Sequence, residues 1–123
     1  KGDPYSCFCH KTNRLFNEEL VRQKIQIENH ISFQSRFGPK EWLKPYTSDV
    51  LKELVEQGVK NLIVITPGFA SDCIETLEEV DMEYRDFFLY LGGERFSVVP
   101  CLNDSGDSIE LISNLLNKEL WIK

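Results

Sequence analysis

A continuous apolar run from Asn61 to Thr66, NLIVIT, restricts the fold more than any other segment. Runs of this length that are rich in β-branched residues are typical of strands buried on both faces of a sheet. Two further segments, His30 to Ser35 and Phe96 to Pro100, also predict strands, and helical patterns lie before, between and after the three. We therefore predict an α/β fold with a doubly wound, three-layer parallel sheet, flavodoxin-like in arrangement, in the order α-β-α-β-α-β-α.

The first two helices are predicted from apolar periodicity and from the residues at their ends. The first helix covers roughly Cys9 to Val21. The second begins at Thr47, a residue that can cap a helix with its hydroxyl group. It ends before Gly58, which we expect in the left-handed conformation that closes many helices.

The third helix is predicted from Ser71 or Asp72 as far as Gly92, and the fourth from about Asp107, with Glu110 as its capping-box partner. Both carry an apolar stripe that should face a core. The stripe of the third helix contains Ile74, Leu77, Tyr84, Phe88 and Leu91, and that of the fourth contains Ile109, Ile112, Leu115, Leu116 and Leu120.

The length of 123 residues suits a single domain, predicted over residues 1–123. A sheet of three strands is small, which indicates one part of a larger doubly wound structure. The net charge of −6 argues against a nucleic-acid partner. The four cysteines form neither a C-x-x-C pair nor a dense disulfide framework, so a reducing compartment is expected.

Ligands of parallel α/β sheets bind outside the carboxyl ends of the strands. In this chain those ends are Gln34 to Arg36, Thr66 to Phe69, and Cys101 to Asn103. Any site should therefore be built from these three turns and from the helix that follows each.

The most concentrated polar signal opens the third helix, where Glu75, Glu79 and Glu83 are spaced by four and share a helix face. Crowded carboxylates raise one another's proton affinity, which suits a proton relay or a path for a cation. Two structural explanations remain open. Asp72 and Glu75 are spaced as a capping box, and an acidic first turn also favours the helix dipole.

Four stretches resemble the ferrochelatase family. Gly2 to Tyr5 is similar to its G-D-P-Y, and Gln34 to Gly38 with Trp42 to Thr47 is similar to its Q-S-x-x-G-x-x-x-W-L-x-P-x-T. Pro67 to Glu79 is similar to its P-x-F-x-S/A-D-x-x-E-T-L-x-E, and Pro100 to Ser105 to its P-x-L-N-D-S. The matches span nearly the whole chain in family order. They imply the C-terminal, chelatase-like domain of a larger enzyme of bacterial style.

The resemblance implies a lyase that inserts Fe²⁺ into protoporphyrin IX, the last step of haem biosynthesis, after distorting the porphyrin. It assigns Glu75 to proton handling or Fe²⁺ delivery and makes Glu79 the next acidic group on that path. Trp42, Phe69 and Ser35 would line the porphyrin pocket. Fe²⁺ is then a substrate, and no cofactor is required.

The histidine at which that family inserts metal belongs to an S-F-H-G-L-P segment preceding G-D-P-Y. The chain begins at Lys1, and neither His10 nor His30 matches that position, so we expect the chain alone to be inactive. Asp72 matches a position near the site. Cys73 stands where some relatives carry histidine.

Some members of that family hold a [2Fe–2S] cluster, which needs four cysteine ligands in most proteins. Cys7, Cys9, Cys73 and Cys101 are the candidate ligands, with free thiols as the simpler alternative. The expected partners are protoporphyrin IX, Fe²⁺ and the N-terminal half of the same protein. The expected location is the bacterial cytoplasm, with peripheral membrane attachment or the mitochondrial matrix side as alternatives. Oligomeric state is left open.

Two alternatives to the enzyme remain. One is a non-catalytic, ferrochelatase-like protein that binds tetrapyrrole or metal without insertion. The other is an unrelated flavodoxin-like module with a phosphate or flavin site, which is disfavoured because no G-x-G-x-x-G turn follows any predicted strand.

Overall fold

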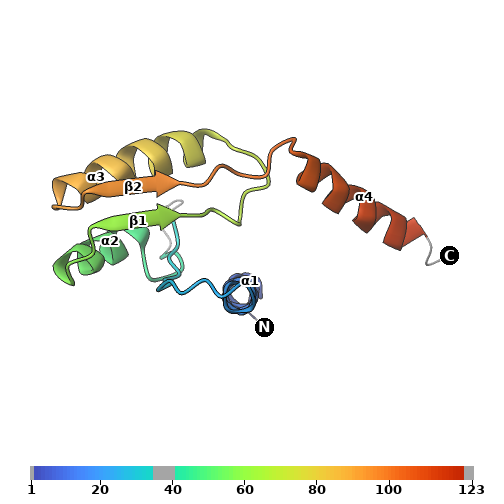
Figure 1. Ribbon diagram of the computed structural model, residues 1–123, viewed down its shortest axis with the longest axis horizontal. Coiled ribbons are helices and arrows are strands. Elements are labelled where there is room, and N and C mark those ends of the chain that lie inside the picture. The colour runs from blue at the N-terminus through green and yellow to red at the C-terminus, as the bar shows by residue number, and fades with distance from the viewer. Residues whose placement is uncertain (1, 35–40, 121–123) are drawn as a thin grey trace. The chain divides into compact units, whose positions relative to one another are not determined.

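The computed structural model describes residues 2–34 and 41–120, which fall into two compact units, Lys1–Val59 and Lys60–Lys123. Each unit is described by itself. The elements in chain order (Figure 1) are α1 (Tyr5–Arg22), α2 (Thr47–Glu56), β1 (Asn61–Val64), the π-helix η1 (Glu75–Tyr84), α3 (Arg85–Tyr90), β2 (Arg95–Val98) and α4 (Gly106–Leu120).

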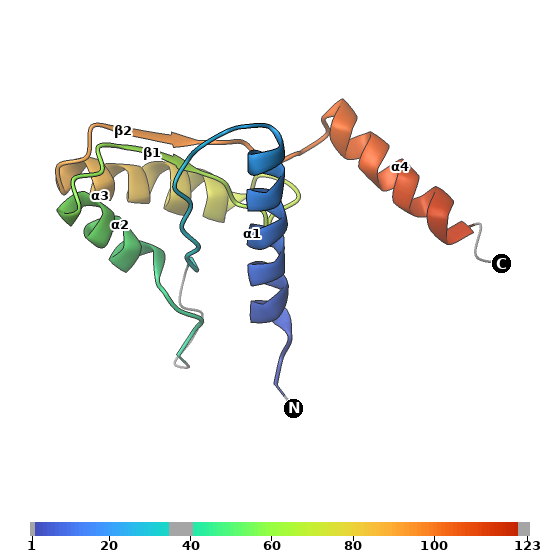
Figure 2. The same ribbon diagram turned by 60° about the horizontal axis from the view of Figure 1, so that its bottom comes forward.

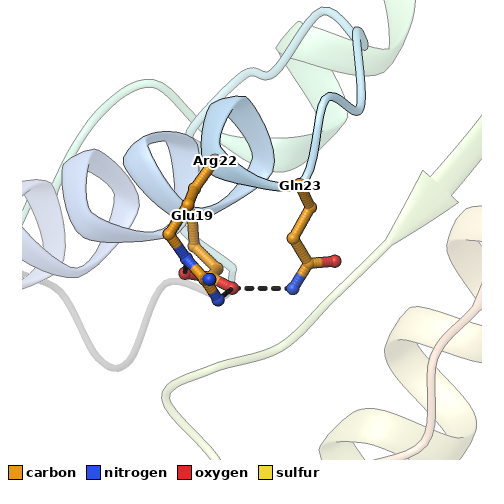
Figure 3. Close-up of polar contacts among 3 residues, drawn as sticks. All are labelled: Glu19, Arg22 and Gln23. Carbon is orange, nitrogen blue, oxygen red and sulfur yellow. Dashed lines mark hydrogen bonds and ion pairs between the residues drawn. The ribbon is translucent and has the colours of Figure 1, made fainter.

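Helix α1 of the first unit is longer at its N-terminal end than the sequence predicts, and none of its residues is fully buried. Its C-terminal end is held by a side-chain cluster (Figure 3). The Glu19 carboxylate accepts hydrogen bonds from Arg22 Nε at 2.7 Å and from Gln23 Nε2 at 2.6 Å. These bonds span the last turn of the helix, where they add to the backbone bond from Gln23 N to Glu19 O.

Helix α2 buries one face through Leu51 and Leu54, which are 2% and 4% exposed. It ends before Gly58, as predicted, and Gly58 has a φ of 90°. The Gly58 N–H donates to Val55 O at 2.9 Å and so closes the last turn. Glycine adopts this left-handed conformation without the steric cost that a Cβ would bring.

The strand predicted over His30 to Ser35 does not form within residues 30–34. A single parallel bridge joins Phe33 to Tyr46, and its backbone bonds run from Phe33 N to Pro45 O and from Thr47 N to Phe33 O. Thr47 was also expected to cap α2, which is wrong, because its hydroxyl group lies 3.0 Å from Ser32 Oγ instead. Ser35 lies outside the described residues.

The sheet of the second unit contains β1 and β2, which lie side by side in parallel (Figures 1 and 2). Asn61 pairs with Arg95 at one end and Val64 with Val98 at the other. The predicted parallel pairing of these two segments is confirmed, although both strands are shorter at their carboxyl ends than expected. A doubly wound, three-layer order stays a prediction, because the sheet of the described residues has two strands.

The core of this unit forms between the sheet and the helical segment η1–α3. Phe88 is fully buried, and its ring centroid lies 5.7 Å from that of Phe96 on β2. Val80 and Thr76 on η1 are 3% and 1% exposed. Gly93 follows the helix so closely that a Cβ there would lie 2.2 Å from the Phe88 ring.

The sequence predicts one α-helix over this segment, whereas the structure has a π-helix from Glu75 to Tyr84 followed by α3. The wider π turn changes which residues share a face. Ile74 and Leu77 were expected on the buried stripe, but they are 64% and 53% exposed. Thr76 and Val80 take their place in the core.

Helix α4 begins at Gly106, and Ser105 Oγ accepts a hydrogen bond from Ser108 N at 3.2 Å. Ser105 is therefore its capping residue, and the predicted capping box of Asp107 with Glu110 is wrong. The predicted apolar stripe does not reach a core, since its described members are at least half exposed: Ile109, Ile112, Leu115 and Leu116. Across residues 2–34 and 41–120, no helix has the length and apolar character needed to cross a bilayer.

Candidate functional site

Two loops leave the carboxyl ends of β1 and β2 and run next to each other. Val99 N donates to Val64 O at 2.9 Å, just beyond the last paired residues. Further along, Thr66 Oγ1 and Cys101 Sγ are 3.4 Å apart. Two of the three predicted turns therefore meet at one edge of the sheet, as expected for neighbouring parallel strands.

Asp72 is the centre of the contacts between these loops. Its Oδ2 accepts a hydrogen bond from Asn103 Nδ2 at 2.7 Å, and its backbone N–H donates to Asn103 Oδ1 at 2.8 Å. Its Oδ1 accepts from Cys101 N at 3.2 Å and from Thr76 Oγ1 at 3.1 Å. The hydrogen bond from Asn103, followed by that from the Cys101 backbone, lowers the pKa of Asp72. The capping box of Asp72 with Glu75 does not form, because the Asp72 N–H donates its hydrogen bond to Asn103 Oδ1.

Glu75 is the first residue of η1, and its side chain is exposed. A hydrogen bond involving the Cys73 side chain, followed by one from the backbone N–H of Glu75 itself, lowers its pKa. The expected rise in proton affinity from crowded carboxylates is therefore wrong for Glu75. The reason is that these hydrogen bonds at the helix start outweigh the opposing effect of burial.

Glu79 lies one turn further along η1 and is half-buried. Tyr84 Oη donates a hydrogen bond to Glu79 Oε1 at 3.0 Å. The sequence analysis placed Tyr84 on an apolar stripe and did not find this contact. Only a π-helical register, in which residues five apart lie on adjacent turns, would have indicated it.

Of the residues predicted for a porphyrin pocket, Trp42 belongs to the first unit and Phe69 to the second. Trp42 in the first unit is 41% exposed, and its ring centroid lies 6.4 Å from that of Tyr5. Phe69 in the second unit is half-buried in the loop after β1, where its N–H donates to Thr66 O at 3.0 Å. Ser35 is outside the described residues, so a pocket made by all three stays a prediction.

The four cysteines are free thiols, with Cys7 and Cys9 on α1 and Cys73 and Cys101 in the loops of the second unit. Within the described part of the chain, no three His, Cys, Asp or Glu side chains gather closely enough to hold a metal ion. Cys101 is half-buried, and burial raises the pKa of its thiol. A cluster on these cysteines stays a prediction.

Two hollows among the described residues lie away from Glu75 and Glu79. One of about 490 Å³ is lined by α1 residues between His10 and Val21. The other, of about 300 Å³, is lined by residues from the segments 29–31 and 45–57. On the acidic face of η1, Glu75 is exposed and Glu79 is half-buried. The assignment of this face to a site needs support from related proteins.

That support comes from known proteins. The paired parallel strands and the helical segment beside them define a mixed α/β protein with polar groups gathered at the carboxyl ends of its strands. The sequence model of the Ferrochelatase family matches residues 1–120, and the chain belongs to this family. The chain is 50% identical over its whole length to the ferrochelatase of Francisella tularensis subsp. novicida (strain U112). It is 48% identical to that of subsp. tularensis (strain WY96-3418) and 47% identical to that of subsp. holarctica (strain OSU18).

In each case all of the chain is covered, but only 37% of the relative. The chain thus spans about a third of the length of these ferrochelatases.

Proposed function

We propose that the complete protein containing this chain is a ferrochelatase that inserts Fe²⁺ into protoporphyrin IX to form protohaem. The observation that carries the proposal is the family match over residues 1–120. It includes the whole of η1, on which Glu75 and Glu79 occupy successive turns. Fe²⁺ is the substrate of this reaction, and the proposal requires no resident cofactor.

Glu75 carries the proposed metal delivery or acceptance of a pyrrole proton, and its lowered pKa favours metal delivery, because a carboxylate with a lower pKa is a weaker base. Its lowered pKa keeps the carboxylate ionised at neutral pH, and its exposure leaves it accessible to a cation or to a bound ligand. Glu79 continues the acidic face toward the middle of η1, where Tyr84 fixes its orientation. Trp42 and Phe69, together with Ser35, would contact the porphyrin.

The test is metal insertion by the complete gene product, followed by the absorbance change of protoporphyrin with Fe²⁺ or Zn²⁺. Glu75→Gln should lower the rate by about 100-fold or more, the range of a lost acid–base group. Glu78→Gln is the matched control, because Glu78 is an exposed carboxylate of the same turn that lies outside the proposed path. Retention of most of the activity by Glu75→Gln would refute the role of that residue.

An absorption spectrum of the purified chain, with and without protoporphyrin, distinguishes the alternatives. A porphyrin band that shifts on addition of the chain, without metal insertion by the complete gene product, would favour a tetrapyrrole-binding protein. Iron–sulfur absorption would support a [2Fe–2S] cluster on Cys7, Cys9, Cys73 and Cys101. We expect no insertion by the chain alone.

The proposal also covers partner and location. We expect the N-terminal half of the same protein to complete the porphyrin site, since the related ferrochelatases are longer than this chain. The proposed location is the bacterial cytoplasm, with peripheral contact to a membrane. Cell fractionation with and without a high-salt wash tests this, because salt releases proteins held at a membrane by charge.

A further inference from the structure

The contacts between the two loops after β1 and β2 concentrate on one pair of residues, Asp72 and Asn103. The pair is reciprocal. The Asp72 N–H donates to Asn103 Oδ1 at 2.8 Å, and Asn103 Nδ2 donates to Asp72 Oδ2 at 2.7 Å. The side-chain oxygen and nitrogen of Asn103 thus bind the backbone N–H and one carboxylate oxygen of Asp72. We call this pair the loop latch.

The backbone of Asn103 is built for this contact. Its φ is 50°, in the left-handed region that asparagine, aspartate and glycine tolerate best. The Asn103 N–H donates to Ala70 O at 3.0 Å, and Nδ2 also donates to Cys101 O at 3.0 Å. The backbone N–H and both polar side-chain atoms of Asn103 are therefore directed either to the opposite loop or to its own turn.

The latch continues into the first turn of η1 through Thr76. Asp72 Oδ1 lies 3.1 Å from Thr76 Oγ1, a side chain that is only 1% exposed. Thr76 Oγ1 in turn accepts a hydrogen bond from Cys73 N at 3.0 Å. Thr76 immediately follows Glu75, so the residue that anchors the turn to the latch is next to the proposed reactive carboxylate.

We propose that the loop latch of Asp72 and Asn103 positions Glu75 for metal insertion by fixing the first turn of η1 on the loop that follows β2. Asp72 is then a positioning residue and does not carry protons in the reaction. The inference rests on the proposed function, because it assigns a role within that reaction. It adds Asn103, to which the sequence analysis gave no role.

Two features favour positioning over proton transfer. Both carboxylate oxygens of Asp72 already accept hydrogen bonds from this chain, from Cys101 N and Thr76 Oγ1 on one oxygen and from Asn103 on the other. The hydrogen bond from Asn103 also lowers the pKa of Asp72, which keeps the carboxylate ionised and unable to donate a proton at neutral pH.

Exchanging the side chains of Asp72 and Asn103 distinguishes a positioning role of Asp72 from a role in proton transfer. In Asp72→Asn the new amide faces the Asn103 amide, so two donors meet. In Asn103→Asp two carboxylates meet. The double variant Asp72→Asn/Asn103→Asp places an amide donor opposite a carboxylate again and keeps an acceptor for Cys101 N. It loses only the bond to Cys101 O, and position 103 tolerates aspartate at its φ.

In the complete gene product, each single variant should lower kcat for metal insertion by about tenfold, with little change in KM for porphyrin, and the double variant should recover to within about threefold. The matched control is Asp104→Asn, which removes an exposed carboxylate next to Asn103 and should leave kcat unchanged. A folded double variant no more active than Asp72→Asn would overturn the proposal, because the carboxylate at position 72 would then itself be required. Full activity of both single variants would overturn it as well.

A second measurement does not depend on activity. The amide protons of Thr76 and Leu77 donate to Cys73 O and report on the first turn of η1. Their hydrogen exchange should accelerate about tenfold in each single variant, return in the double variant and stay unchanged in Asp104→Asn. If the wild-type protein inserts no metal but exchange follows this pattern, the proposed function fails and the latch alone stands. If exchange is the same in all variants, the latch does not fix this turn and the inference fails.

Discussion

Tyr84 and Glu79 are five residues apart, and the phenolic hydroxyl of the first donates to the carboxylate of the second at 3.0 Å. In an α-helix, residues three and four apart face each other, whereas the π-helical register brings residues five apart onto adjacent turns. Tyr84 is also the last residue of η1 before the chain returns to α-helical geometry at Arg85. The contact therefore links the proposed acidic path to the end of the π-helix.

Removal of this hydroxyl group should weaken catalysis without removing a charge. We expect Tyr84→Phe to lower kcat for metal insertion by about two- to tenfold, which corresponds to one hydrogen bond of about 0.5–1.5 kcal/mol. The measurement is the absorbance assay on the complete gene product. Tyr90→Phe serves as the control, because Tyr90 is 87% exposed. Equal activity of the two variants would show that the orientation of Glu79 is unimportant.

The close approach of Gly93 to Phe88 predicts a strong steric effect. A Cβ at position 93 would lie within 2.2–2.7 Å of three atoms of a ring that is fully buried and cannot move aside. Gly93→Ala should therefore lower the free energy of unfolding by about 1–3 kcal/mol, measured by urea denaturation. In the Phe88→Leu background the same substitution should cost less, because the smaller side chain leaves room.

Gly106→Ala is the control for this effect. No atom lies within 4 Å of a Cβ at position 106, and the residue opens α4. Alanine is favoured over glycine in a helix by about 0.5–1 kcal/mol, so this variant should be neutral or slightly stabilising. Destabilisation equal to that of Gly93→Ala would point to a general intolerance of alanine and not to the Phe88 ring.

The hydrogen bonds of Glu19 with Arg22 and Gln23 predict that the stability of the C-terminal end of α1 falls at acidic pH. The hydrogen bond from Arg22, followed by that from Gln23, lowers the pKa of Glu19 from 4.5 to about 2. A folded-state pKa below the unfolded value means that the stabilisation is complete above pH 4.5 and is lost as the pH falls toward 2. The NMR shift of the Glu19 carboxyl carbon should titrate with a midpoint near 2. In Arg22→Ala the midpoint should move back toward 4.5, and a wild-type midpoint near 4.5 would contradict the contacts in Figure 3.

The environment of Cys101 predicts that its thiol reacts slowly with alkylating reagents. Burial raises its pKa, and the hydrogen bond with Thr66 opposes that rise only in part. Because the thiolate is the reactive form, Cys101 should be alkylated by iodoacetamide at pH 8 more slowly than the exposed Cys7. Thr66→Val removes the opposing hydrogen bond and should slow Cys101 further. Mass spectrometry of the native and urea-unfolded chain provides the measurement, and the two rates should converge on unfolding.

The sequence was sufficient for elements whose local signals agree. The strand beginning at Asn61 and the left-handed Gly58 lie where the pattern and the end signal predict them, and the helix expected near Thr47 forms although Thr47 does not cap it. Prediction failed where a longer-range contact decides the outcome. Phe33 makes a single bridge to Tyr46, and the expected strand around it does not form within residues 30–34. The apolar spacing of residues 74–91 fits an α-helix, so the pattern did not indicate the π-helical register of Glu75–Tyr84.

The candidate site also has features that the sequence predicted and features that it did not. Glu75 and Glu79 were predicted from spacing and from family motifs; both lie on η1, and their roles in the site stay predictions. The hydrogen bonds of Asn103 and Tyr84 were not predicted, because each depends on a partner that only the folded chain brings near. The direction of the Glu75 pKa was also wrong. The sequence shows neighbouring charges, but it does not show the hydrogen bonds that a side chain accepts at the start of a helix.

The parallel pairing of β1 with β2 has a consequence for the order of folding. The strands are separated in sequence by the whole of η1 and α3, so no hairpin can nucleate their contact. The chain must first lose the entropy of closing this long connection, and only then do the strand hydrogen bonds form. We therefore expect the sheet to form late in folding. Substitutions within β1 or β2 should mainly accelerate unfolding and leave the refolding rate nearly unchanged.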